Sequence, residues 1–317
     1  MLTVLLGFGT ATGYALHDFL MVKVVRAASV WTGLTWSMGV ALAILLPLAL
    51  LLDGPPSGFA EWRAAGIAVA SGLAEAAGLA CLLRGLVTGR LSLVTPLASL
   101  SGGLVALIMV LGGETLSTAA LVGLPLAVAG GLLASIERVP KEEVFGPDPA
   151  SLDPVPAPGG DAPALSGTGA SVPGRVRRRR THATAGAGWA LASSALFGVT
   201  MMLLAWATAL HPVAVAAYGR LGTMVVLLPV TLVLAGLRLP RPLAKRAAVA
   251  GCFDAGAFVA LATAISIGPV AIASVLASLG GLVAAVLGFF FLRERLSAVQ
   301  YAGVGITCVA VALLASS

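Results

Sequence analysis

The stretch 71–86, SGLAEAAGLACLLRGL, places the acid Glu75 inside an apolar run that is long enough to cross a membrane. A helix needs about 20 residues to span a bilayer core of about 30 Å. The whole chain has this character, because 59% of its 317 residues are hydrophobic and only 10% are charged. Its mean hydropathy is +1.03. Since helices satisfy their own backbone polar groups in lipid, the sequence predicts an all-α polytopic membrane protein.

Ten apolar runs predict ten transmembrane helices in two groups of five. The first group covers about 2–22, 29–52, 63–87, 91–112 and 117–136, and the second covers about 186–209, 212–236, 246–267, 269–292 and 297–315. Between the groups, residues 137–183 are rich in Pro, Gly, Ala and Ser and contain few large apolar side chains. Such a composition predicts a disordered linker. We therefore divide the chain into a five-helix unit at 1–136, a linker at 137–183 and a second five-helix unit at 184–317.

Matching motifs in the two groups predict that the chain is an internal duplication. PLASLSGGLVA at 96–106 corresponds to VLASLGGLVA at 275–284, and a Glu-x-Leu-Ser turn occurs at Glu114 and again at Glu294, 180 residues later. Because five is odd, the second unit must enter the membrane from the opposite side. The prediction is thus two inverted five-helix repeats, a plan common among secondary transporters that bind substrate near the midplane.

The repeat gives Glu75 a counterpart. Carrying the offset of 179 between Ser99 and Ser278 back along the chain maps Glu75 onto Asp254. A charge at this depth costs at least about 2.5–3.5 kcal/mol and usually faces a cavity or a partner. Two interpretations stay open. The pair lines a central cavity and binds protons or the polar or cationic part of a substrate, or the acids are neutral or paired and hold helices together.

Arg220, about eight residues into the seventh span, is the obvious counter-charge for Asp254, although an anionic substrate is an alternative partner. Near the cytoplasmic end of the first span, His17 and Asp18 could form a gate or a proton relay, or be a solvated pair at the interface. Aromatic rings could line the pathway by stacking, or could pack and anchor at the interface instead. The aromatic candidates are Tyr14, Trp36 and Tyr218.

Basic residues predict the orientation. Seventeen of the nineteen Lys and Arg residues fall on the side of the linker, including the cluster Arg177 to Arg180. Basic residues favour the cytoplasmic side, so the linker is expected there, with both termini outside a plasma membrane. We interpret the arginine cluster as a topology signal, and we expect no nucleic-acid partner.

The chain resembles the drug/metabolite transporter superfamily of EamA type. LGGETLSTAALVG at 111–123 and FLRERLSAVQYAG at 291–303 are similar to a Leu-Gly-Glu-Arg-Leu-Ser pattern in that family, and the likeness covers both halves. Two positions depart from it. His17-Asp18 replace a small polar pair, and Met38 stands where the second half has Arg220. The resemblance implies exporters or exchangers of small metabolites or drugs, whose termini commonly lie in the cytoplasm, opposite to the orientation that the charges predict.

These features predict a secondary transporter of a small polar or amphipathic metabolite or drug, working by alternating access, with proton coupling left open. A lipid-carrier flippase or a divalent cation permease of the same fold are alternatives, and a membrane-embedded enzyme fits least, since the chain has only three histidines. We expect no catalytic residues, cofactor or metal site. The expected partners are a small-molecule substrate and the lipid bilayer, and protons stay open as a third partner. One chain is expected to suffice, and a homodimer stays open.

Overall fold

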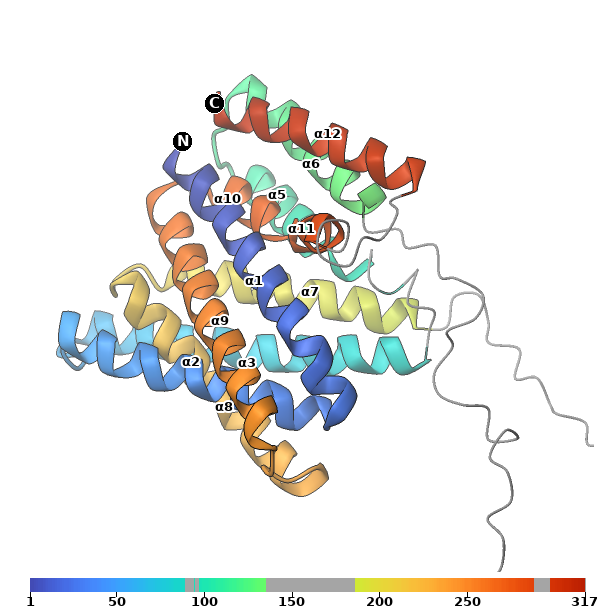
Figure 1. The fold of residues 1–317 in the computed structure, drawn as a ribbon. Coiled ribbons are helices and arrows are strands. Elements are labelled where there is room, and N and C mark those ends of the chain that lie inside the picture. Colours follow the sequence, from blue (N-terminus) through green and yellow to red (C-terminus); the bar gives the residue numbers. More distant parts are fainter. Residues whose placement is uncertain (89–93, 95–96, 135–185, 288–296, 317) are drawn as a thin grey trace, which may run out of the picture.

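The structure, a computed structural model, describes residues 1–88, 94, 97–134, 186–287 and 297–316. Within these ranges every regular element is a helix (Figure 1). The first half contains α1 (Leu2–Ala27), α2 (Val30–Leu52), α3 (Phe59–Thr88), α5 (Ser101–Leu111) and α6 (Thr118–Ala134). The second contains α7 (Ala187–Trp206), α8 (Pro212–Leu234), α9 (Arg241–Ile267), α10 (Val270–Ala277), α11 (Gly280–Leu287) and α12 (Ala298–Ala315). The predicted linker at 137–183 lies outside the described residues.

Among the described residues, six helices are long and apolar enough to cross a membrane: α2, α3, α7, α8, α9 and α12. Shorter apolar helices cover Ser101–Leu111, Thr118–Ala134 and Val270–Val283. Their length and composition mark a multi-pass membrane protein. The count of ten spans stays a prediction.

The fourth apolar run of each half, which we predicted as a single span, is interrupted. A turn at Ser278 and Leu279 separates α10 from α11, and a turn at Ser99 and Leu100 precedes α5. The Ser278 hydroxyl donates to the Val275 carbonyl at 2.7 Å, and glycine follows the turn. Serine side chains compete for backbone partners and glycine is a poor helix former, so both breaks lie at the shared Ser-Leu and Gly-Gly motif.

Helix packing follows a pseudo-two-fold pattern. In the repeat, α1, α2 and α3 correspond to α7, α8 and α9. Helix α1 packs on α9, and the equivalent pair, α7 and α3, also packs together. Likewise α3 packs on α8, and the equivalent pair, α9 and α2, packs together. The helices α2 and α6 each pack on their own counterparts, α8 and α12, and α5 packs on α10 of the corresponding fourth run. A two-fold axis relates contacts in this reciprocal way. Figure 1 shows α6 beside α12 at the end of the molecule where both chain termini lie.

Two equivalent glycines allow close approaches in these pairs of helices. A Cβ placed on Gly72 of α3 would lie 1.9 Å from the Gly219 carbonyl oxygen of α8. A Cβ on Gly251 of α9 would lie 2.3 Å from the Ser37 carbonyl oxygen of α2. Small residues let membrane helices approach where lipid offers no hydrophobic drive. Both glycines precede an acid by three residues, so they bring Glu75 and Asp254 close to the neighbouring helix.

Serine caps begin the last helix of each half. Ser297 and Gln300 form a capping box at the start of α12, with Gln300 N donating to Ser297 Oγ at 3.3 Å and Ser297 N donating to Gln300 Oε1 at 2.8 Å. Ser117 Oγ accepts from Ala120 N at 3.1 Å before α6. The last helix of each half therefore begins with a serine cap in the same place of the repeat.

Candidate functional site

Three charged side chains meet between the two halves of the molecule, and we call Glu75, Arg220 and Asp254 the charge triad. Arg220 Nη1 donates to Glu75 Oε2, and Nη2 donates to Asp254 Oδ1 at 2.8 Å. Arg220 Nε lies 2.8 Å from Asp254 Oδ2, close enough for an ion pair but not aligned for a hydrogen bond. One guanidinium thus joins α3 of the first half to α9 of the second. The expected pairing of Arg220 with Asp254 is present, and Glu75 shares the same cation.

The charge triad is almost completely buried. Arg220 is 0% exposed, Asp254 is 2% exposed and Glu75 is 9% exposed. Two carboxylates and one guanidinium carry a net charge of −1 when all three are ionised. A buried charge needs a partner, so one negative charge in this site remains to be balanced by a cation or removed by a proton.

Two further side chains complete the surroundings of Arg220. The Thr223 hydroxyl lies 2.9 Å from Glu75 Oε2, and the Phe258 ring centroid lies 4.0 Å from the guanidinium carbon. The ring therefore adds a cation–π contact. Sequence reasoning missed both residues. Helical spacing could have found them, because Thr223 follows Arg220 by three residues and Phe258 follows Asp254 by four, which places each pair on one helix face.

Two residues predicted from the first span lie beside the triad. Tyr14 on α1 is half-buried and interacts electrostatically with all three charges. His17, one turn further along α1, is buried and interacts electrostatically with Asp254 and Arg220. Its Nε2 lies 2.9 Å from Ser37 Oγ of α2, a contact that the sequence did not predict. The structure thus gathers groups from α1, α2, α3, α8 and α9 in one place.

Three predicted residues lie at the surface or away from the triad. Asp18 is exposed and reaches the site only through His17, whose Nδ1 is 2.9 Å from Asp18 Oδ1. Trp36 is exposed and its Nε1 donates to the Leu237 carbonyl at 2.9 Å. Tyr218 is half-buried and packs on the apolar core around α8. The structure does not bring Trp36 or Tyr218 together with the charge triad.

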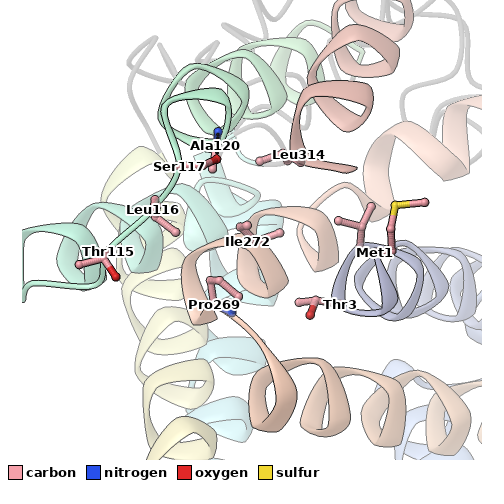
Figure 2. A pocket seen from close by; sticks show the side chains of 10 residues that line it. Met1, Thr3, Thr115, Leu116, Ser117, Ala120, Pro269, Ile272 and Leu314 are labelled. Carbon is pink, nitrogen blue, oxygen red and sulfur yellow. Dashed lines mark hydrogen bonds between the residues drawn. The ribbon is translucent and has the colours of Figure 1, made fainter. Parts of the chain in front are cut away.

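Two pockets lined by described residues do not reach the triad. One cavity of about 230 Å³ lies near the chain termini, where Figure 2 shows Thr3, Leu116 and Pro269 around it. The other, of about 250 Å³, is an apolar hollow between α2 and α8 that includes Trp36. Neither is lined by a triad residue. In this conformation both acids are paired with Arg220, and the central cavity stays a prediction.

Glu114, which the sequence places in a turn, connects the two halves near the first pocket. Its Oε1 accepts from Val270 N at 2.6 Å and its Oε2 accepts from Ala271 N at 3.0 Å. A carboxylate at a helix N-terminus satisfies free N–H groups and the helix dipole. Glu114 therefore caps α10, and its role here is structural.

Comparison with known proteins identifies the class. A model of the EamA-like transporter family matches residues 1–136 and again residues 184–316, so the chain belongs to this family. It is a membrane transporter of the drug/metabolite type, and the family is one of transporters and not of enzymes. No curated protein matches the sequence.

One solved structure, described as "Crystal structure of protein", is similar over almost its whole length. The match covers 98% of this chain and 96% of the other, with a TM-score of 0.72 and 14% sequence identity. At that identity the similarity supports the arrangement of the helices and carries no statement about substrate.

Proposed function

We propose that the protein is a secondary transporter, working by alternating access, for a small polar or amphipathic metabolite or drug that carries a positive charge. The observation that carries the proposal is the charge triad, in which one buried arginine serves two buried carboxylates from different halves of the chain. The uncompensated negative charge favours a cationic substrate or a proton. We place this transporter in the plasma membrane.

The charge triad can bind either a substrate cation or a proton, and the two compete for the same carboxylates. A substrate cation that reaches the acids competes with Arg220 for the same oxygens, and protonation of either acid removes one of the arginine's partners. Proton binding and cation binding then exclude each other, which is the requirement for coupling the two in opposite directions. We therefore favour proton-coupled export over uncoupled transport.

The closed state of the triad fits one step of such a cycle. Alternating access needs a conformation in which the site is sealed, and the Arg220 contacts tie α3, α8 and α9 together. The interrupted helices in corresponding places of the two halves give further support, because broken segments are a common feature of transporters built from inverted repeats. One chain contains both halves of the site, so a monomer suffices for the proposed cycle.

A ligand screen on the purified protein tests the proposal. Organic cations, zwitterions, anions and neutral compounds are compared for their effect on the thermal unfolding midpoint, since a ligand that binds only the folded state raises it. We expect cations to stabilise the wild type, more strongly at alkaline than at acidic pH. The variants Glu75→Gln and Asp254→Asn should lose this effect. Stabilisation by anions alone, or cation binding that both variants retain, would contradict the proposal.

A further inference from the structure

We infer that Asp18, His17 and Ser37 form a proton path that leads from the surface to Asp254. This inference rests on the proposed function, in which the charge triad binds a proton. It assigns the residues that deliver the proton, and it makes the delivery specific to the first half of the chain.

The three groups form a continuous line from solvent to the protein interior. The Asp18 side chain is 75% exposed, and its Oδ1 lies 2.9 Å from His17 Nδ1. On the far side of the ring, Nε2 lies 2.9 Å from Ser37 Oγ, and Ser37 is 0% exposed. A histidine that contacts a surface carboxylate with one nitrogen and a buried hydroxyl with the other can pass protons between them.

The inner end of this line reaches the charge triad through α9. The Ser37 backbone packs directly on Gly251, which precedes Asp254 by three residues, or about 4.5 Å along a helix. His17 and Asp254 interact electrostatically with each other. Figure 1 shows α1 running beside α9 over this region. The relay requires a bridging water or a rotation of the Asp254 side chain between Ser37 and the triad.

Asp254 has an oxygen that can accept the proton. Its Oδ1 accepts a hydrogen bond from Arg220, whereas its buried Oδ2 is paired with Arg220 Nε at 2.8 Å but accepts no hydrogen bond from the described residues. Glu75 Oε2, in contrast, contacts both Arg220 and Thr223. Hydrogen bonds to a carboxylate favour its charged form, and Glu75 accepts more of them than Asp254. The proton therefore goes to Asp254.

The transfer balances as a relay of one proton. Asp18 takes a proton from water and gives it to Nδ1 of His17, while the proton on Nε2 moves to the Ser37 oxygen. The serine hydroxyl proton moves to Asp254, and a transfer through water returns the His17 proton from Nδ1 to Nε2, which restores the starting tautomer. One proton enters from water, one arrives on Asp254, and no other bond changes.

The charges around His17 come from three helices. Asp18 lies on α1, Asp254 on α9 and Arg220 on α8, and α2 contributes the uncharged Ser37. Glu75 of α3 is paired with Arg220 and so affects the charge that His17 faces. The helices α10 and α11 also pack on α1, and they carry no ionisable side chain over Val270–Ala277 and Gly280–Leu287. Tyr14, one turn before His17 on α1, also interacts with the triad charges, and His17 is the ionisable side chain that joins Asp18 to Ser37.

Time-resolved infrared spectroscopy of the reconstituted protein after an acid jump tests the path. The absorbance of the protonated carboxyl group reports the arrival of the proton, and Asp254→Asn identifies the band. His17→Gln keeps hydrogen-bonding atoms but cannot act as an acid or base, so we expect the band to appear about a hundredfold more slowly with unchanged final amplitude. Ser37→Ala should slow it as well, and added imidazole should restore the rate in His17→Ala.

Each outcome bears on a different claim. A wild-type rate in His17→Gln, or no rescue by imidazole, overturns the path while leaving the proposed function intact. If wild type and Asp254→Asn show the same infrared bands after the jump, Asp254 takes up no proton, and the proton-coupled function fails together with the path. Retention of the thermal unfolding midpoint in His17→Gln separates a lost relay from a misfolded protein.

Discussion

The helices α2 and α8 occupy equivalent places in the two halves, yet they differ at one buried position. Arg220 of α8 is 0% exposed, and Met38, its counterpart on α2, is 4% exposed. The acids that flank this position are preserved in both halves, as Glu75 on α3 and Asp254 on α9. The helix arrangement is therefore nearly symmetric, but the buried positive charge is present only in the second half. The two acids share this one cation.

Removing that cation should have the largest effect. Arg220→Met makes the second half like the first and leaves two buried acids without their partner, which costs about 3–5 kcal/mol of folding free energy. The loss should shrink as the medium is acidified, because protonated acids carry no charge. Unfolding in detergent micelles across a pH series measures it. Arg246→Met, which removes an exposed arginine of α9, is the control and should change little. A pH-independent loss would contradict the assignment of the two acids as the cause.

Moving the cation to the other half sharpens the comparison. By the pseudo-two-fold pattern, an arginine at position 38 should face the same two acids from α2. The double variant Met38→Arg/Arg220→Met should therefore be more stable than Arg220→Met alone. The same unfolding assay measures the difference, with Met38→Arg alone as the reference for overpacking. Equal stability of the double variant and Arg220→Met would show that the two positions are not equivalent in space.

The glycines that bring the acids into place should give the next largest effect. Gly72→Ala and Gly251→Ala force a Cβ into backbone atoms of α8 and α2, and overpacking of this kind costs about 1–3 kcal/mol. Gly66→Ala and Gly256→Ala are matched controls on the same helices, because a Cβ there meets nothing within 4 Å. Alanine is the better helix former, so the controls should be neutral or stabilising. Similar effects at all four positions would argue against the close approach.

The serine caps should give the smallest effects, and nearly equal ones. Ser117→Ala and Ser297→Ala each remove one hydrogen bond at the start of the last helix of a half, at a cost of about 1 kcal/mol. Unfolding of the two variants under one set of conditions measures whether the halves are equivalent away from the triad. A threefold difference between them would mean that the asymmetry extends beyond the charged site.

Much of the fold could be predicted because apolar runs and repeated motifs can be recognised from the sequence alone. The repeat supplied the long-range information that a single span lacks, since it gave Glu75 a counterpart in Asp254. The helix breaks at Ser99 and Ser278 were missed, because hydropathy measures how apolar a segment is and not whether its backbone is continuous.

The composition of the site was harder to predict than its location. Arg220 was expected to choose between a substrate and Asp254, and the structure shows it bound to both acids. Which oxygens a guanidinium reaches depends on the separation of α3, α8 and α9, and Gly72 allows the close approach of α3 to α8. Trp36 and Tyr218 were aromatic residues on the right helices but on faces turned away from the triad. Side-chain direction depends on helix rotation, which neighbouring helices determine.

The most direct test of the central claim is the charge movement that follows an acid pulse applied to proteoliposomes on a solid-supported membrane. This measurement needs no knowledge of the substrate. If the acids of the charge triad bind the coupling proton, the wild-type protein gives a transient current, and Glu75→Gln/Asp254→Asn abolishes it while remaining folded. A folded double variant with the wild-type transient would show that the proton binds elsewhere, and that the triad only holds the helices together.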